Sequence, residues 1–237
     1  MTPKSPLEVA TEDLENLTRF ISHDLRSPIR SIIGFSNLLL DQSPQAFDDS
    51  AISNIKTNIK KIIGIAQRTQ LLIDSMLTYT RLSERKLQVC ELDLTGICTE
   101  ICSSIVSNRK NIHSKPIDIL ITPNLKAQGD KTLITVMLEN LIDNAIKFAS
   151  KNETVKIQIG STTTPKGNAF FIQDNGVGFD MAHAQYLFTP FELLHNQEKY
   201  SGIGMGLPIS KKIIDLHDGA IWFDSKVNSG TTFYFQI

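Results

Sequence analysis

The stretch SHDLRSP, residues 22–28, lies in a run whose apolar residues recur every three or four positions. That repeat predicts a helix that buries one narrow stripe against other helices. His23 is two residues from both Ile21 and Leu25, so at roughly 100° per residue it points away from the stripe. Asp24 follows it and can orient the ring or accept its proton. The stretch predicts a packed helix with an imidazole in water, although a surface histidine beside an acid on an ordinary helix has the same pattern.

Two long helices are expected around this stretch. The first runs from about Thr11 to Leu40, and Pro28 should kink it just past His23, because proline cannot donate to the Asp24 carbonyl. The polar turn DQSPQAFDDS separates it from a second helix, expected from about Ala51 to Ser83.

The second helix has its own nearly unbroken apolar stripe. Two long striped helices joined by a short turn predict an all-α antiparallel hairpin. One hairpin cannot cover both stripes, so we expect a homodimer in which two chains form a four-helix bundle. The stripe of the second helix consists of Ile52, Ile55, Ile59, Ile62, Ala66, Thr69, Ile73 and Met76.

Composition restricts the class of protein. The 237 residues are 41% hydrophobic, enough for one large domain or two modest ones, and the net charge of −1 gives no electrostatic footprint for nucleic acid or membrane surfaces. No apolar run reaches about 18 residues, and no signal-peptide pattern opens the chain. Three cysteines without a CxxC pair favour a reducing cytoplasm, with Cys98 and Cys102 as small core residues. The five scattered histidines do not predict a zinc cluster.

After about residue 85 the pattern changes to short alternating elements. We therefore expect two domains, an all-helical unit over residues 1–85 and an α+β sandwich over 86–237, with helices on one face of a sheet. The expected strands are 87–91, 117–121, 154–161, 169–173, 219–224 and 231–237, and the expected helices are 93–107, 129–149 and 207–217.

The segment ENLIDNAIKF, residues 139–148, places three polar side chains on one helix face. Asn140, Asn144 and Lys147 are spaced i, i+4, i+7. Two amides and an ammonium suit a magnesium–phosphate group, because amide oxygens can face hydrated Mg²⁺ and lysine can contact phosphate. A solvated polar face is the alternative.

The segment DNGVGFD, residues 174–180, directly follows an expected strand. A carboxylate at a strand end followed by two glycines lets a flat ligand lie against the backbone. The alternative is a hairpin-type turn, because Asn-Gly is the strongest short turn signal.

The segment SGIGMGLPISKKI, residues 201–213, is a glycine-rich loop that opens a helix, with Pro208 near its first position. Its amides and the helix N-terminus form an anion site suited to phosphates. Its spacing does not fit a Rossmann fingerprint, and the residues before it are not a strand. The alternative is a flexible loop with a capped helix.

The order of these motifs is more specific than any one of them. A histidine–acid pair, NxxxNxxKF, DNGVGFD, LFTPFELLH, GxGxGL and GTTFYFQI follow one another over residues 11–237. This order resembles the kinase core of two-component sensor histidine kinases, a dimerisation and phosphoacceptor hairpin followed by an ATP-binding domain of the histidine kinase, gyrase and chaperone ATPase type. The sequences SHDLRSP and LLHNQEKY are most similar to those of the phytochrome-associated and hybrid branch.

The resemblance implies roles for the residues around the transferred phosphate. It implies that His23 is the phosphoacceptor and that Asp24 activates it. Asn144 would be the principal Mg²⁺ ligand, with Asn140 supporting it and Lys147 touching phosphate.

The resemblance also implies the base and phosphate contacts of ATP. Asp174 would accept from the adenine amino group, with Thr231 helping from the last hairpin, and residues 192–203 would form a mobile lid. The remaining cofactor-binding positions are the pocket glycines Gly176 and Gly178, and the loop residues Gly202, Gly204, Gly206 and Leu207. Phe188 and Phe191 would mark the phenylalanine box.

One position departs from the family pattern. Ser27 stands four residues after the histidine, where threonine or asparagine is usual. Without the β-methyl that restricts χ1, its hydroxyl should hold an attacking water less firmly. We therefore expect feeble phosphatase activity towards the partner.

The expected activity is transfer of the ATP γ-phosphoryl group to His23 and then to an aspartate of a response-regulator receiver domain. Such transfer needs positioning and charge neutralisation more than covalent help, so residues 81–86 are the expected hinge between the two domains. One alternative is another ATPase or a serine kinase of the same fold, against which the histidine-bearing hairpin argues. Another is a docking scaffold without catalysis, against which Asn144, Asp174 and the glycine loop argue.

Overall fold

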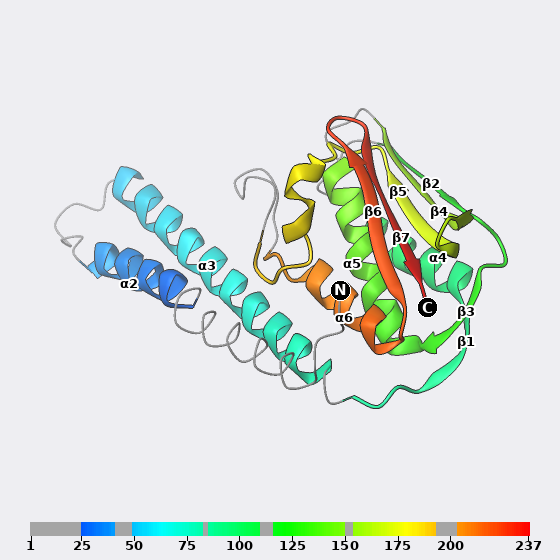
Figure 1. Ribbon diagram of the computed structural model, residues 1–237. Helices are drawn as coiled ribbons and strands as arrows, with labels where there is room; N and C mark the ends of the chain where they lie inside the picture. Colours follow the sequence, from blue (N-terminus) through cyan, green and yellow to red (C-terminus); the bar gives the residue numbers. More distant parts are fainter. Residues whose placement is uncertain (1–24, 41–48, 83–84, 110–115, 150–153, 193–202) are drawn as a thin grey trace. The chain divides into compact units, whose positions relative to one another are not determined.

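The computed structural model describes most of the chain (Figure 1). It divides into two compact units, Met1–Thr80 and Arg81–Ile237. His23, Asp24 and Gly202 lie outside the described residues, as do most of the expected turn and most of the expected lid. The described ranges are 25–40, 49–82, 85–109, 116–149, 154–192 and 203–237.

The described part of the first unit is helical, as predicted. Helix α2 (Arg26–Leu40) begins immediately after a turn residue, Leu25, whose carbonyl accepts the Ile29 N–H at 3.4 Å. Pro28 therefore lies in the first turn of α2, where its missing N–H leaves no intrahelical bond unmade. The expected kink involves Asp24 and so lies outside the described residues.

Helix α3 (Asp49–Leu82) contacts α2, since the Lys61 Nζ lies 5.2 Å from the Phe35 ring centroid. The hairpin nevertheless leaves many large apolar side chains uncovered. Six of them are between 38% and 59% exposed: Ile29, Ile33, Leu38, Ile52, Ile63 and Leu71. No helix in the described ranges is both long and apolar enough to cross a membrane.

The second unit contains a five-stranded sheet in the order β2-β4-β5-β7-β6. Strand β2 pairs parallel with β4, and the other neighbours are antiparallel. The two predicted hairpins, β4–β5 and β6–β7, are confirmed. The bounds are β2 Ile117–Ile121, β4 Val155–Thr164, β5 Gly167–Asp174, β6 Ala220–Lys226 and β7 Gly230–Gln236.

Three helices pack against this sheet: α4 (Leu94–Arg109), α5 (Lys131–Ala149) and α6 (Gly206–Leu216). Strand β4 shows that they cover one face, because Val155, Ile157 and Ile159 are buried while Lys156 and Gln158 between them are exposed. The predicted sandwich is therefore confirmed. Helix α5 is central to it, with nine buried residues from Leu133 to Ala149.

Two cysteines belong to this core, as predicted. Cys98 and Cys102 lie one turn apart on α4 and are 1% and 5% exposed. Burial raises the pKa of Cys98 to about 12 and that of Cys102 to about 11, so both remain neutral thiols that act as small apolar groups.

A second, two-stranded sheet was not predicted. Strand β1 (Val89–Asp93) begins two residues later than expected and pairs antiparallel with β3 (Lys126–Asp130). The β3 sequence KAQGD lacks the apolar alternation of a strand, so only its pairing reveals it. Residues Gly129 and Asp130, expected to open a helix, end this strand instead.

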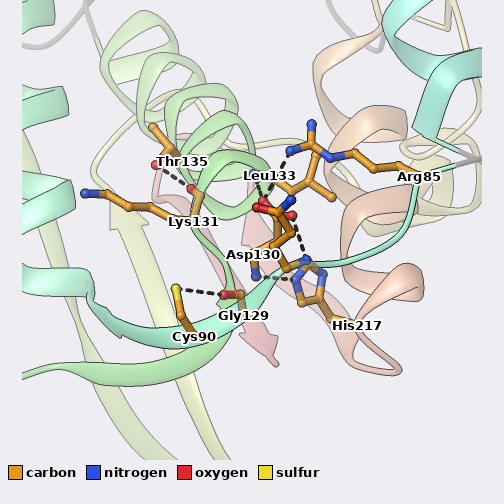
Figure 2. Close-up of polar contacts among 9 residues, drawn as sticks. Arg85, Cys90, Gly129, Asp130, Lys131, Leu133, Thr135 and His217 are labelled. Atoms are coloured by element: carbon orange, nitrogen blue, oxygen red, sulfur yellow. Dashed lines mark hydrogen bonds and ion pairs between the residues drawn. The ribbon is translucent and has the colours of Figure 1, made fainter.

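Asp130 joins three separate segments at the start of α5 (Figure 2). Its side chain is buried, and Oδ1 accepts the Leu133 N–H at 3.2 Å, which caps the helix. Oδ2 accepts the Gln88 N–H at 3.1 Å, and the Arg85 guanidinium lies 3.6 Å from Oδ1. The segment before β1 is thus bound to the N-terminus of α5.

The backbone of Asp130 is bound as well. Its N–H donates to His217 Nε2 at 3.0 Å (Figure 2). His217 Nδ1 lies 2.7 Å from the Ile213 carbonyl oxygen. Because Nε2 accepts and Nδ1 donates, the ring is the neutral Nδ1–H tautomer. His217 follows the last residue of α6, so Asp130 also connects the start of α5 to the end of α6.

These contacts predict the effect of removing the Asp130 carboxylate. Asp130→Ala should lower the free energy of unfolding at neutral pH by about 2 kcal/mol, through loss of a helix cap and of a buried hydrogen bond. Denaturant unfolding measures the change. Asp118→Ala, which removes an exposed aspartate of β2, should leave stability nearly unchanged.

The difference in unfolding free energy between the parent and Asp130→Ala should also depend on pH. Burial raises the pKa of Asp130, but backbone N–H groups and Arg85 outweigh it and hold the pKa below the ordinary 3.8. A depressed pKa contributes stability above the ordinary value, and that stability is lost as the pH falls through the folded-state pKa. The gap between parent and variant should therefore shrink in acid; a constant gap would contradict an ionic role.

Candidate nucleotide-binding site

Asp174 lies at the end of β5 with its carboxyl group turned into the protein. It is 6% exposed, and its Oδ1 accepts two N–H groups, from Gly176 at 2.7 Å and from Thr231 at 3.3 Å. Burial raises the pKa of Asp174 to about 6, although both hydrogen bonds oppose the shift. Oδ1 is therefore occupied by the fold, and Oδ2 is the oxygen left for a ligand.

Asn175 excludes the hairpin-turn alternative for this segment. Its side-chain Oδ1 accepts the Lys156 N–H at 2.9 Å, and its Nδ2 donates to the Thr154 carbonyl at 3.0 Å. The Asn-Gly pair is thus bound to the start of β4 and does not reverse the chain into a neighbouring strand. Sequence spacing alone did not identify this role.

The two pocket glycines permit close backbone approach. A Cβ on Gly176 would lie 2.7 Å from the Phe148 carbonyl oxygen, and Val177 donates to that carbonyl at 3.2 Å. Gly178 has φ +56°, and its Cβ would lie 2.1 Å from the Lys226 carbonyl oxygen. The loop therefore packs between the end of α5 and the β6–β7 turn, and side chains at either glycine would force these apart.

The polar face of α5 lies beside the start of α6. A Cβ on Gly206 would be 3.2 Å from Asn140 Oδ1, so these two predicted site residues are neighbours. Among the described residues, Asn140 Nδ2 is the one buried side-chain nitrogen or oxygen without a hydrogen-bond partner. Asn144 lies one turn along the same face, followed by Lys147, whose Nζ lies 4.7 Å from the Phe148 ring centroid.

The described part of the glycine loop has the geometry of a helix start. Gly204 has φ +72°, and its carbonyl accepts the Phe191 N–H at 3.1 Å. Helix α6 begins at Gly206 with Leu207 next, and Met205 is its N-cap residue without a side-chain cap. Pro208 is the third residue of the helix, within the predicted first turn. Pro208 has no N–H and the Ile209 N–H donates to the Met205 carbonyl at 3.0 Å, so Gly206 and Leu207 are the residues of this turn whose N–H groups can face an anion.

Aromatic packing holds the segment before this loop. The ring centroid of Phe188, predicted from the phenylalanine box, lies 5.7 Å from that of Phe223 of β6. The ring centroid of Phe179 lies 5.5 Å from that of Phe223. Phe191 has the unusual φ of +67°, and a Cβ on Gly204 would lie 2.9 Å from its carbonyl carbon.

Ser27, another predicted site residue, belongs to the first unit. It is exposed in the first turn of α2.

Three motifs far apart in the sequence therefore converge in the second unit: the loop after β5, the polar face of α5 and the start of α6. The arrangement offers a carboxylate oxygen, amide groups and helix N–H groups, which are complementary to a purine base and to phosphates.

Comparison with known proteins agrees with this arrangement. Residues 129–237 match the family described as histidine kinase-, DNA gyrase B- and HSP90-like ATPase. Residues 13–85 match the His Kinase A (phospho-acceptor) domain. The chain thus belongs to the histidine kinases and contains both domains of their kinase core, as the motif order predicted.

Individual relatives place it near the branches named from the sequence. It is 32% identical to the phytochrome-like protein Cph1 of Synechocystis, over 98% of this chain and 30% of that protein. It is 28% identical to hybrid signal transduction histidine kinase B of Dictyostelium discoideum, over 97% of this chain and 12% of that protein. The chain therefore spans less than a third of either relative.

A solved structure supports the fold over both domains. The histidine kinase ThkA, in complex with the response regulator protein TrrA, superposes with a TM-score of 0.66 at 23% identity. The match covers 95% of this chain and 63% of that one.

The raised pKa of Asp174, together with the adenine contact that the resemblance implies for it, predicts how ATP affinity depends on pH. A base amino group donates best to the ionised carboxylate, so protons compete with ATP. Affinity should be full above about pH 6 and decrease by up to about tenfold per unit below it. Calorimetric titration of the chain with ATP at several pH values measures this dependence.

Two variants serve as controls for this prediction. Asp174→Asn should bind ATP weakly with a flat pH profile, whereas Asp224→Asn, at an exposed aspartate of β6, should keep the parent profile. Because the folded-state pKa of Asp174 is raised, its contribution to stability is lost as the pH rises through about 6. Asp174→Asn should therefore be more stable than the parent at pH 7. If the ATP affinity of the parent does not change with pH, the adenine of ATP binds elsewhere.

Proposed function

We propose that this chain is an ATP-dependent protein histidine autokinase that phosphorylates its own His23 and passes the phosphoryl group to an aspartate of a response-regulator receiver domain. The observation that carries the proposal is the convergence of Asp174, Asn140 and Gly206 in one unit, although they are far apart in the sequence. Residues 1–85 would form the dimerisation and phosphoacceptor domain, and residues 86–237 the catalytic domain.

The proposed ATP orientation follows from the chemistry of the two ends of the site. The adenine would lie against Gly176 and Gly178 with its amino group on Asp174 Oδ2, since Oδ1 already accepts two N–H groups. The phosphates would lie between the polar face of α5 and the first turn of α6, whose N–H groups and helix dipole favour anions. Gly204, Gly206 and Leu207 supply that turn, with Gly202 preceding it.

The donor set fits Mg²⁺ bound together with phosphate. Asn144 and Asn140 present amide oxygens, which are hard ligands, and the unpartnered Asn140 Nδ2 can donate to a phosphate oxygen. Lys147 lies on the same face for a further phosphate contact. When bound, the metal would neutralise the charge that develops on the transferred group.

His23 is the proposed nucleophile. A ring nitrogen forms the bond to the γ-phosphorus, the bond from phosphorus to the ADP oxygen breaks, and Asp24 takes the ring proton. The phosphoryl group then moves to a receiver aspartate and restores the free imidazole. The solved relative ThkA, bound to a response regulator, supports such a partner.

The segment 81–86 remains the proposed hinge for bringing the catalytic unit to His23. Within it, Leu82 belongs to α3 and Arg85 contacts Asp130. We also propose a cytoplasmic location, which is supported by the free thiols of Cys90, Cys98 and Cys102.

His23→Ala should abolish stable labelling of the chain by γ-labelled ATP while ATP binding persists. The label on the parent should be acid-labile and base-stable, as expected of phosphohistidine. His113→Ala is the matched control and should label as the parent does. Release of free phosphate without label would favour another ATPase of this fold, neither product would favour a scaffold, and an acid-stable label would favour a hydroxyl acceptor.

The dimer is proposed from the apolar side chains that the hairpin leaves exposed. Ile59 and Ile63 of α3 are 42% and 50% exposed, and their burial against a second copy would complete a four-helix bundle. A charge at either position would be buried without a partner in such an interface.

Replacing both residues, Ile59→Glu with Ile63→Glu, should therefore convert the dimer to a monomer in sedimentation velocity. Lys60→Glu, at an exposed residue between them, should remain dimeric. A double variant that sediments as the parent does would show that this face is not the interface.

A further inference from the structure

Ser225 of β6 lies between the loop after β5 and the start of β7. Its Oγ accepts the Phe179 N–H at 2.9 Å, lies 3.2 Å from the Gly230 carbonyl oxygen and lies 2.9 Å from Thr231 Oγ1. Phe179 belongs to the loop that begins at Asp174, and Thr231 donates its N–H to Asp174. One hydroxyl therefore contacts both segments that form the proposed adenine pocket.

The three contacts together define which hydroxyl donates. Ser225 has one hydroxyl proton, and a carbonyl oxygen can only accept, so the contact with Gly230 uses that proton. The Phe179 N–H donates to Ser225. The contact with Thr231 is then made only if the Thr231 hydroxyl donates to Ser225 Oγ. This is the one assignment in which all three contacts are hydrogen bonds.

The assignment determines what Thr231 presents to a ligand. Its hydroxyl proton is directed to Ser225 and its N–H to Asp174 Oδ1, so Thr231 Oγ1 has only lone pairs to offer. Asp174 Oδ2 is likewise an acceptor when ionised. Two neighbouring acceptors favour an exocyclic amino group and repel an oxygen at the same position of a purine.

We infer that Ser225 is a positioning residue for base specificity: it holds the Thr231 hydroxyl as an acceptor, so that the pocket prefers a 6-aminopurine to a 6-oxopurine. The inference rests on the proposed function, in which Asp174 receives the purine of a nucleoside triphosphate.

The surrounding backbone holds Ser225 in place. Asn228 N–H donates to the Val177 carbonyl at 2.7 Å, so the β6–β7 turn is bonded to the loop. A Cβ on Gly230 would lie 2.0 Å from the Asp174 carbonyl oxygen, and one on Gly178 would lie 2.1 Å from the Lys226 carbonyl oxygen. These backbone contacts leave little room for the hydroxyl to shift away from Thr231.

A purely structural role is the competing explanation, since a serine with three hydrogen bonds also stabilises a strand. The two roles differ in their effect on selectivity. Loss of stability weakens binding of every purine nucleotide by the same factor. Without Ser225 Oγ as its acceptor, the Thr231 hydroxyl can rotate and donate a hydrogen bond to the ligand. A donor at this position no longer repels a 6-oxo group, so the preference for ATP decreases.

The test compares ATP with inosine triphosphate, which has a 6-oxo group, by calorimetric titration of the full chain with Mg²⁺. Ser225→Ala should lower the affinity ratio of ATP to inosine triphosphate by about three- to tenfold, the size of one hydrogen bond. Thr231→Val should lower the ratio similarly, and the double variant should lower it no further. Ser229→Ala, at an exposed serine of the same turn, is the matched control and should keep the parent ratio.

Equal weakening of both nucleotides in Ser225→Ala would overturn the inference and leave Ser225 a structural residue. If Ser225→Ala does not fold, two other variants test the inference. Ser225→Thr, which retains the hydroxyl, should keep the parent affinity ratio of ATP to inosine triphosphate, and Thr231→Val should lower it. An unchanged ratio in Thr231→Val would also overturn the inference. A parent chain that binds neither nucleotide would instead refute the proposed function.

Discussion

The buried carboxyl group of Asp174 is the contact on which the nucleotide-binding unit depends. Its Oδ1 receives N–H groups from the loop that follows β5 and from the start of β7, so one atom fixes the separation of two segments. Burial disfavours the charged form, as the raised pKa shows, and a neutral amide would avoid that cost. Retaining a carboxylate there is the kind of local instability that a binding site requires.

The helix pair α5–α6 connects this carboxyl group to the part of the site where the phosphates are proposed to bind. The helices are antiparallel, since Asn140 in the middle of α5 lies beside Gly206 at the start of α6, and Asp130 before α5 bonds His217 after the end of α6. Helix α5 is nearly enclosed by the core, so its polar face can point in only one direction. The amides proposed to hold Mg²⁺ are thus oriented by apolar packing on the opposite side of the same helix.

Much of this architecture could be predicted from the sequence, because it depends on periodicity and on glycine. Helical repeats predicted α3 and α5, and alternation predicted β2 and both hairpins of the main sheet. Strand β3 was missed because KAQGD acquires its conformation by pairing with β1. Ser225 and Asn175 were missed because their partners lie far along the chain, and a lone polar residue in or after a strand carries no periodic signal. His23, Asp24 and Gly202 were singled out by their sequence patterns, their individual roles were inferred from the family resemblance, and all three lie outside the described residues.

The attachment of the segment before β1 has a mechanical consequence. Gln88 and Arg85 bond to Asp130, so a pull on this segment is resisted at the N-terminus of α5 before it reaches the pairing of β1 with β3. That point lies about 20 Å along the helix from Asn144. Helix α5 packs in the core along most of its length, so a displacement at one end is transmitted along the helix. The segment before β1 is therefore attached to the second unit at the end of α5 that lies away from Asn144, one of the amides proposed to hold Mg²⁺.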